Sequence, residues 1–172
     1  MSIDKNKAVL EFLSDCPVIK DNPLYFNFAD AEDNNSQYLT SSTDVSMNKT
    51  FVDGSKLRVF TFTLVTFKSI SNNAIIKEDT EVGENPVVNE RTVISENVED
   101  MFELQEIIDW VNEQGEEHNY PNFGDRIVVD DMQTSTDTPY FEGVDTGVNP
   151  ALAMYSIAIR IDYIDYTKTI CY

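Results

Sequence analysis

The sequence predicts an α+β fold, in which an antiparallel or mixed β-sheet packs against one main helix and a short N-terminal helix. Two long runs, residues 56–70 and 151–166, alternate in the way that half-buried strands do. Residues 95–114 instead repeat apolar side chains at helical spacing. Because helices and strands do not alternate regularly along the chain, we expect α+β rather than α/β order.

The chain begins with two amphipathic segments. Residues 4–14 predict a helix with Asp4 as its N-cap, and Cys16-Pro17 should end it because a residue before proline avoids the α region. Residues 24–31 alternate in polarity and predict a half-buried strand. Its apolar face would consist of Leu24, Phe26 and Phe28.

The following stretch, residues 32–48, is rich in Asp, Asn, Ser and Thr, so we expect at most a short strand around Tyr38–Ser41. Asp53-Gly54 is a strong turn signal, and this turn is expected to fix the register of the strand that follows it. That strand, residues 56–70, is β-branched and aromatic, which predicts a long central strand.

Residues 71–92 break these patterns with charged and turn-forming side chains. A structureless loop of this length is uncommon inside a compact domain, so we expect a projecting arm or hairpin, inserted into a single domain over residues 1–172. The arm is the expected intermolecular element because its short apolar pairs have no evident core to join. The interface residues predicted there are Ile75, Ile76, Val87 and Val88.

The main helix, residues 95–114, should be capped by Ser95 or Asn97 and should end at Gly115 in the C′ position. A strand is then expected over residues 126–134, followed by turns around Pro139 and Gly147 and by the final strand. The expected core residues are Phe60, Phe62, Met101, Leu104, Ile108, Trp110, Tyr155, Ile157 and Ile159.

The formal net charge is −19, from 31 acidic and 12 basic side chains. Such a chain repels phosphate backbones, so proteins that grip DNA or an anionic membrane are disfavoured. A protein lining a path along which DNA slides is compatible with this charge. No secretory signal or membrane span is apparent, and we expect a soluble protein made in a cytoplasm, with Cys16 and Cys171 reduced and one of them buried.

Candidate catalytic and metal-binding patterns are weak, and we expect no enzyme, cofactor or metal. His118 is the one histidine; Glu116 or Glu117 could orient it, but a solvated loop residue is the favoured interpretation. Zinc ligands are too few, and no glycine-rich phosphate loop occurs. The acidic run from Asp30 lacks the glycine and glutamate that a calcium loop requires.

Several local sequences follow one another in a characteristic order along the chain. They are the opening helix ending at Cys16-Pro17, then Tyr25–Asp30, Phe51–Ser55, Arg58–Phe62, the helix Phe102–Gln114 containing Ile108-Asp109-Trp110, Asn119–Pro121, Tyr155–Ile157 and Arg160–Tyr163. In this order the chain resembles the small minor capsid or tail terminator proteins of long-tailed bacteriophages of Gram-positive bacteria, and of related phage-tail-like particles. Residues 71–92 are longer than the connection usual in that family.

The resemblance implies a structural virion protein that closes into a homohexameric ring, caps the tail tube, ends its polymerisation and joins it to the neck. Its partners would be further copies of itself, the tail tube protein, and the sheath and neck or stopper proteins, and genomic DNA would pass through the lumen without tight binding. It would assemble in the host cytoplasm and lie in the virion.

The physics of rings agrees with this expectation. A ring needs heterologous interfaces, in which one patch meets a different patch on the neighbour, and the long strands 56–68 and 151–166 are candidates to carry one. Acidic side chains around the lumen would keep DNA from adhering.

Three other functions stay open from the sequence. The nearest is another head–tail connector, such as a stopper or head-completion protein. An acidic DNA-mimic inhibitor of a nucleic-acid enzyme would also be strongly negative, although apolar strands and an arm favour assembly. A small hydrolase is the third, and replacing His118 with alanine would test whether any activity depends on it.

Overall fold

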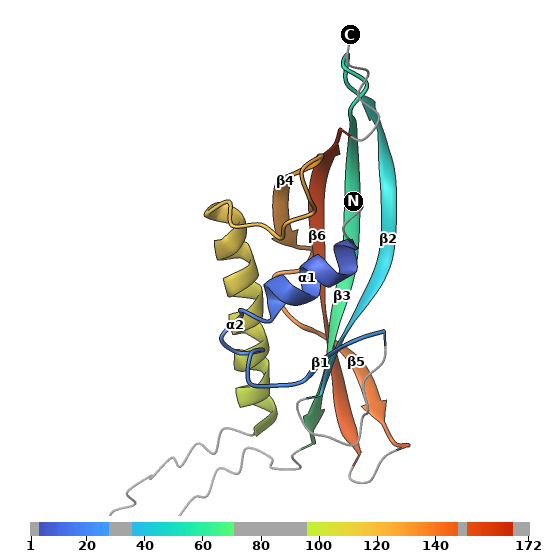
Figure 1. Cartoon of the computed structure of the whole chain (residues 1–172). Helices are drawn as coiled ribbons and strands as arrows, with labels where there is room; N and C mark the ends of the chain where they lie inside the picture. Colours follow the sequence, from blue (N-terminus) through green and yellow to red (C-terminus); the bar gives the residue numbers. More distant parts are fainter. Residues whose placement is uncertain (1–3, 28–35, 71–95, 148–150, 167–172) are drawn as a thin grey trace, which may run out of the picture.

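A computed structural model describes residues 4–27, 36–70, 96–147 and 151–166 (Figure 1). Within them a six-stranded mixed sheet packs against a short N-terminal helix and one long helix, which confirms the predicted α+β class. The elements in chain order are α1 (Lys5–Leu13), β1 (Leu24–Phe26), β2 (Gln37–Thr50), β3 (Lys56–Ser69), α2 (Glu96–Glu116), β4 (Ile127–Thr134), β5 (Tyr140–Asp145) and β6 (Leu152–Asp165).

The sheet has the order β1-β2-β3-β6-β4, and β5 pairs with β6 on the same side as β4. Strand β1 is parallel to β2, and the other pairs are antiparallel. Strands β3 and β6 pair without interruption from Lys56↔Asp165 to Ser69↔Leu152 and form the centre of the sheet. The C-terminal part of β6, from Ile159 to Asp165, pairs with β4, and the N-terminal part, from Leu152 to Ser156, pairs with β5. These two short strands therefore share one edge of the sheet.

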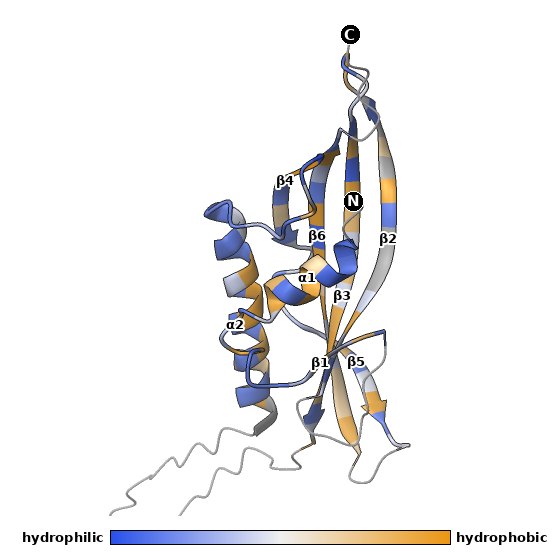
Figure 2. Ribbon diagram, in the orientation of Figure 1, coloured by the Kyte–Doolittle hydropathy of each residue, from blue (hydrophilic) through white to orange (hydrophobic). Residues whose placement is uncertain are grey.

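The core lies between the sheet and the two helices, which cover the same face. Figure 2 shows the apolar side of α2 turned toward the sheet and its hydrophilic side turned outward. Met101 and Trp110 are half-buried against this core. The other predicted core residues are buried: Phe60, Phe62, Leu104, Ile108, Tyr155, Ile157 and Ile159. The alternation of the two central strands therefore predicted their inward face correctly.

Helix α1 agrees with its prediction. The Asn6 N–H donates to Asp4 Oδ1 at 3.0 Å, so Asp4 is the N-cap, and the helix ends at Leu13. Cys16 follows in a turn and is fully buried, and burial raises the pKa of its thiol. Cys171 lies outside the described residues.

Helix α2 does not end where the sequence predicted. Gly115 is inside the helix, which continues to Glu116. The helix is closed instead by His118, at φ +57°: its N–H donates to the Gly115 carbonyl at 3.1 Å, and the Asn119 N–H donates to the Gln114 carbonyl at 2.9 Å. This is a Schellman motif with histidine in the C′ position that glycine usually takes.

The start of α2 also differs from one of the two predictions. Because Asn97 lies within the helix, which begins at Glu96, it is not the N-cap. Ser95, the other predicted cap, lies outside the described residues.

Strand β2 is much longer than predicted. The polar stretch 32–48 was expected to hold at most a short strand, but residues 37–50 form one continuous 14-residue strand. Its many Ser and Thr residues are tolerated because β2 pairs with β3 from Gln37 to Ser46 and again at Thr50, with register shifts after Ser41 and Ser46, and such tertiary pairing outweighs local propensity.

Strand β1 is shorter than predicted and is not half-buried. Only Leu24–Phe26 is a strand, and Tyr25 and Phe26 are exposed; Phe28 lies outside the described residues. The segment between Pro139 and Gly147 was expected to be turns, but Tyr140–Asp145 pairs with β6 as strand β5. The predicted arm at 71–92 lies outside the described residues.

Candidate assembly surfaces

His118 is not part of a catalytic arrangement in the described structure. Its side chain is exposed, and its Nδ1 lies 2.9 Å from the hydroxyl of Tyr120 rather than beside a carboxylate. Over residues 4–27, 36–70, 96–147 and 151–166, no three His, Cys, Asp or Glu side chains gather in a way that could hold a metal ion. The Asp30 run lies outside those residues.

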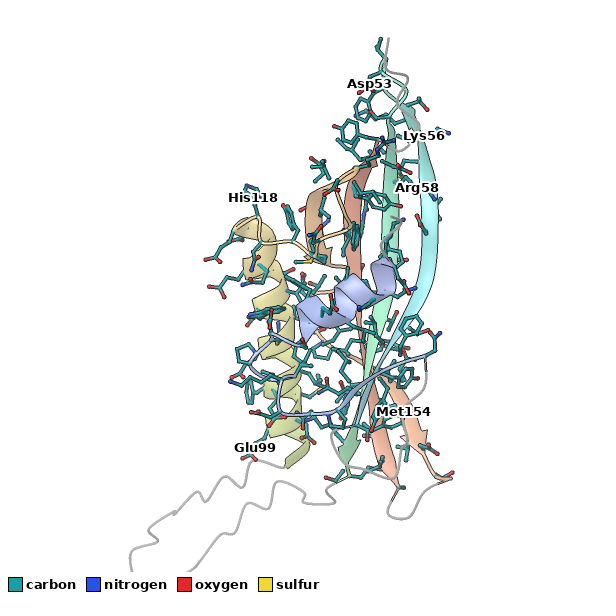
Figure 3. All side chains as sticks on the ribbon, viewed as in Figure 1. Asp53, Lys56, Arg58, Glu99, His118 and Met154 are labelled. Atoms are coloured by element: carbon teal, nitrogen blue, oxygen red, sulfur yellow. The ribbon has the colours of Figure 1, made fainter. Side chains whose placement is uncertain are left out.

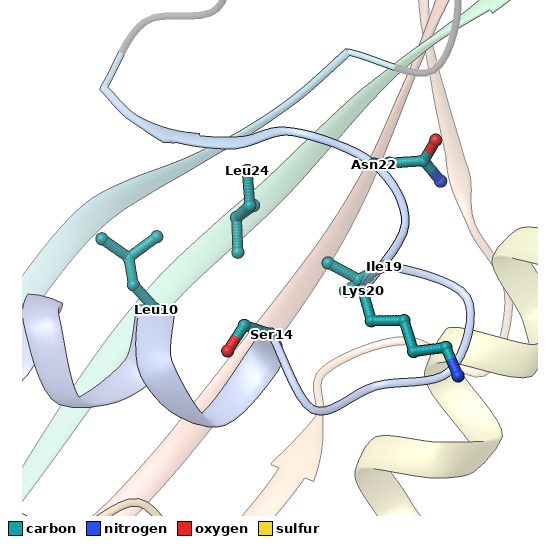
Figure 4. Close-up of a pocket in the computed structure, with 6 residues that line it drawn as sticks. All are labelled: Leu10, Ser14, Ile19, Lys20, Asn22 and Leu24. Atoms are coloured by element: carbon teal, nitrogen blue, oxygen red, sulfur yellow. The ribbon is translucent and has the colours of Figure 1, made fainter.

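A pocket of about 220 Å³ lies between α1 and the loop after it (Figure 4). Leu10, Ile19 and Leu24 supply its apolar wall, and Lys20 is the one charged residue that lines it. The Ser14 hydroxyl donates to the carbonyl of Glu11 at 2.6 Å, so no base activates it as a nucleophile.

The Asp53-Gly54 pair lies in the turn that joins β2 to β3. Asp53 Oδ1 accepts hydrogen bonds from the Ser55 N–H at 3.0 Å and from the Ser55 hydroxyl at 2.7 Å, and these bonds lower the pKa of Asp53. Gly54 has φ +87°, and its N–H donates to the Phe51 carbonyl at 3.0 Å. The turn is therefore held by its own hydrogen bonds, with Val52 fully exposed at its tip.

The β4 edge of the sheet is covered by groups from α2 and the segment after it. The Thr134 N–H points away from β6 and donates to Asn112 Oδ1 at 2.9 Å. The Tyr120 hydroxyl donates to the Asp130 carbonyl at 3.2 Å. The Thr134 N–H and the Asp130 carbonyl are therefore already paired, and a further strand could not hydrogen-bond at these two positions.

Among the described strands, only β1 pairs with the outer side of β2. Strand β1 covers only its beginning, where the Asn27 N–H donates to the Leu39 carbonyl at 2.7 Å. From Thr40 to Thr50 no described strand lies on the outer side of β2. At 3.3 Å per residue this is an edge of about 35 Å.

The register identifies which backbone groups of β2 are turned outward. The Phe67 N–H donates to the Ser36 carbonyl at 3.0 Å, so odd-numbered β3 residues direct their backbone groups toward β2. Asp44 and Ser46 pair with the even-numbered Phe60 and Arg58. Their amides therefore point away from β3, toward the open side.

A polar cluster ties α1 to β2, β3 and β6. Asp44 Oδ2 lies 2.7 Å from Lys5 Nζ, and Asp44 Oδ1 accepts from Arg58 Nη2 at 3.1 Å and from the Tyr163 hydroxyl at 2.8 Å. Burial and the Asp44 carboxylate raise the pKa of Tyr163, so the phenol stays protonated. The cluster fixes the one carboxylate that β2 turns toward the helices.

A cleft of about 480 Å³ lies where the C-terminal end of α2 meets β4. Four carboxylates line it, those of Glu116, Asp130, Asp131 and Asp137, and no lysine or arginine does. Helix α2 itself has eight acidic residues and no basic one. Its exposed acidic residues, with the one after it, are Glu99, Glu103, Glu106, Asp109, Glu113, Glu116 and Glu117.

The predicted interface residues Ile75, Ile76, Val87 and Val88 lie outside the described residues. The open β2 edge was not predicted, although a run of 14 residues without proline or glycine was a usable signal for a strand.

No protein-family model matches this chain, and no curated protein sequence matches it. Neither of the two described helices combines the length and apolar character that crossing a membrane requires.

Proposed function

We propose that the protein is a structural virion protein that forms a ring, caps the tail tube of a long-tailed phage or related particle, and joins the tube to the neck. The observation that carries this proposal is the contrast between the two sheet edges. Asn112 and Tyr120 pair with two outward backbone groups of β4, whereas no described strand lies on the outer side of β2 from Thr40 to Thr50, a length of about 35 Å. Proteins generally guard sheet edges, so a long open one indicates a strand-pairing partner.

A strand added to β2 by a different segment of the next copy would be a heterologous contact, the kind that a closed ring requires. The sequence predicted that the two central strands would carry this contact, but neither is an edge strand of the sheet. Strands β3 and β6 each have neighbours on both sides, so their backbone groups are satisfied within the protomer.

The helix-free face of the sheet is the candidate channel surface. Thr61 and Thr63 lie on it, opposite to the inward-facing Phe60 and Phe62. Arg160 is also on this face, and Asp162 neutralises it through two hydrogen bonds of 2.7 Å. DNA would thus meet hydroxyls and a neutralised arginine, while the exposed acidic row of α2 lies on the other side of the sheet, contrary to the expectation of a strongly acidic lumen.

The first experiment is the mass of the protein in solution, alone and mixed with tail tubes, by light scattering and negative-stain microscopy. Rings, or caps at one end of each tube, are the expected result. A protein that stays monomeric and ignores tube ends would refute the proposal. Binding to portal rings in place of tubes would favour the stopper or head-completion alternative.

A proline variant tests the edge directly. Ser46→Pro removes an outward amide that β3 does not use, so the protomer should fold while rings are lost. Val45→Pro is the matched variant: Val45 pairs with Val59 and directs its amide toward β3, so its replacement should unfold the hairpin. Intact rings with Ser46→Pro would exclude β2 as the contact.

The exposed acidic row of α2 favours a second candidate, the DNA-mimic inhibitor. Such a mimic binds a basic nucleic-acid enzyme through its carboxylates and releases it at high salt. Replacing Glu106 and Glu113 with glutamine would weaken such an inhibitor and leave β2-dependent rings intact. Loss of nuclease inhibition with unchanged solution mass would support the mimic over the ring.

A further inference from the structure

Strand β5 has an apolar edge that no described strand covers. Among the described strands β5 pairs only with β6. Tyr140, Phe141 and Val144 are exposed by 62%, 50% and 45%, and they make up half of the strand. Proteins commonly protect sheet edges with lysine or proline, and β5 contains neither. An apolar edge of this kind is a place where another strand can add.

The acidic side chains of β5 are held by hydrogen bonds within the protomer. The Ser156 hydroxyl donates to Glu142 Oε1 at 2.6 Å, and the Gly147 N–H donates to Asp145 Oδ1 at 2.8 Å. A strand that reached this edge would therefore meet backbone groups and apolar side chains, with both carboxylates already hydrogen-bonded.

The register identifies which backbone groups of β5 are turned to its uncovered side. The Ser135 N–H donates to the Ala158 carbonyl at 2.7 Å, so even-numbered β6 residues direct their backbone groups toward the β4 and β5 side. Phe141 and Val144 instead pair with odd-numbered β6 residues. In an antiparallel pair, the backbone groups of such residues point away from the partner strand. Phe141 and Val144 therefore offer their amides and carbonyls to the uncovered side.

We infer that the uncovered edge of β5 pairs with the outer edge of β2 of a second copy of this chain, with Phe141 opposite Asp44 and Val144 opposite Ser41. Strands β2 and β6 run in the same direction, because each is antiparallel to β3, and β5 is antiparallel to β6. Two copies in the same orientation therefore present β5 and β2 as antiparallel strands.

The spacing of the outward groups selects this register. Ser41 pairs with an even-numbered β3 residue, as Asp44 does, so both turn their amides outward. These two residues are three positions apart because of the irregularity after Ser41, and Phe141 and Val144 are three apart because of the irregularity after Phe141. One register thus matches both positions. It begins beyond Leu39, whose carbonyl accepts from the segment that follows β1.

The same register also brings matching faces together. Tyr140 would lie opposite Val45, and directly opposed residues place their side chains on the same side of a sheet. Tyr140 pairs with Ser156 and Val45 pairs with Val59, and both partners are on the helix-free face. The side chains of Tyr140 and Val45, exposed by 62% and 51%, would then cover each other.

The pairing displaces the second copy along the strands. Phe141 shares a register row with Gln37 of its own copy, so placing it opposite Asp44 requires a displacement of about 20 Å. Figure 3 shows the two levels: Met154, beside β5, lies well below Arg58, which pairs with the outer half of β2. Four strand spacings across one copy measure about 19 Å, which gives a strand tilt of about 45°. Closed sheets need such a stagger, with a tilt typically of about 35–45°.

The inference rests on the proposed function, since it names the segment of the next copy that pairs with β2. The contact is heterologous, because β5 of one copy meets β2 of the other, and each copy keeps a free β2 and a free β5 for further neighbours. Repetition of one such contact can close a ring.

An engineered disulfide tests the register. Tyr140 and Val45 would form a non-hydrogen-bonded pair with Cα atoms about 4.5 Å apart, which a disulfide can bridge. Tyr140→Cys/Val45→Cys, with Cys171→Ser to leave only the buried Cys16, should give a ladder of linked dimers and larger species on mild oxidation. Tyr140→Cys/Val52→Cys is the matched control: Val52 is more exposed than Val45, yet this variant should link no faster than Tyr140→Cys alone.

Mixing the two single-cysteine variants identifies the partner strands. Tyr140→Cys mixed with Val45→Cys should stop at linked dimers, because each copy then has one usable thiol. Val45→Cys that links to itself at the rate of the mixture would show β2 pairing with β2, and would overturn the inference. Failure of the double variant to link faster than its control would overturn it as well.

A proline variant tests the edge without cysteine. Val144→Pro removes an outward amide that β6 does not use, so it should weaken self-association at least about tenfold in sedimentation. Val144→Ala is the matched control, because it removes side-chain atoms and keeps the amide, and it should associate like the wild type. Thermal melts check that both variants fold, and the disulfide decides if Val144→Pro does not.

The outcomes separate this inference from the proposed function. Rings that survive Val144→Pro but are lost in Ser46→Pro would overturn the β5 contact and leave the proposed function standing. A disulfide ladder from a protein that caps no tube end would support the β5–β2 pairing and count against the proposed function.

Discussion

A Cβ atom added to Gly115 would lie 2.1 Å from the carbonyl oxygen of Met132. Gly115 is in the last turn of α2 and Met132 is in β4, so this approach sets the helix against the strand edge. No other residue has room at that distance. The glycine therefore fixes where Asn112 and Tyr120 reach the edge that they cover.

Gly115→Ala tests this close approach. Alanine normally stabilises a helix interior by about 0.5–1 kcal/mol relative to glycine. Here the overlap must push α2 away from β4, and we expect a net loss of about 1–3 kcal/mol in the free energy of unfolding, measured by urea denaturation. Glu116→Ala, at the exposed neighbouring position, should stay within about 0.5 kcal/mol of the wild type. An unchanged or higher midpoint for Gly115→Ala would contradict the packing.

The central strands and both helices could be predicted because each carries its own periodic pattern, as Phe60, Phe62 and Leu64 do on β3. Strand β2 could not, because its strand state comes from pairing with β3 and not from its polar residues. Gly115 was misinterpreted for a similar reason. A glycine near a helix end usually marks a C-cap, and only the position of Met132, 17 residues later, shows the constraint that β4 places on it.

The candidate surfaces were harder to predict than the fold. Which sheet edge is open depends on where Asn112 and Tyr120 lie in space, and no local pattern encodes that. The total negative charge was evident from sequence, but its separation into a basic hairpin and an acidic helix follows only after Lys49, Lys56 and Arg58 are placed on the hairpin.

Asp44 should make stability depend on pH in acid. Burial alone would raise the pKa of Asp44, but hydrogen bonds from Lys5, Tyr163 and Arg58 outweigh it and lower the pKa below its ordinary 3.8. Because the folded-state pKa is lower than the unfolded one, this stabilisation is complete well above the unfolded pKa of about 4 and is lost as pH falls through the folded value.

Asp44→Asn should therefore lower the free energy of unfolding at neutral pH by about 1 kcal/mol, a low value because a third of the carboxylate side chain is exposed. Below about pH 4 the difference from the wild type should shrink. Glu11→Gln is the control, because its pair with Lys7 is exposed on both sides. Denaturation midpoints measured across the acid range check this, and a constant difference would refute it.

Replacing Lys68 should destabilise the protein less than removing its two carboxylate partners. It is 4% exposed, hydrogen-bonds Glu103 and lies 3.5 Å from Asp100 Oδ1. Lys68→Met removes a buried charge and leaves carboxylates that reach water, so stability should be unchanged or higher. The double variant Glu103→Ala/Asp100→Ala leaves the buried Lys68 ammonium without these two carboxylates and should lower the free energy of unfolding by about 3 kcal/mol. Glu106→Ala, exposed on the same helix, is the control. A calorimetric melting temperature of Lys68→Met below that of the double variant would contradict this prediction.

His118 should tolerate glycine better than alanine. Its φ of +57° is a left-handed conformation that costs residues with a Cβ atom about 1 kcal/mol, and glycine adopts it freely. His118→Gly loses only the exposed contact with the Tyr120 hydroxyl, so its thermal midpoint should equal or exceed that of the wild type. His118→Ala loses that contact and keeps the strain, which should leave it about 1 kcal/mol less stable than the glycine variant. Equal stability of the two variants would mean that the α2 terminus does not depend on the left-handed residue. Neither variant should alter ring formation more than the other, because both remove the same imidazole from the rim of the cleft.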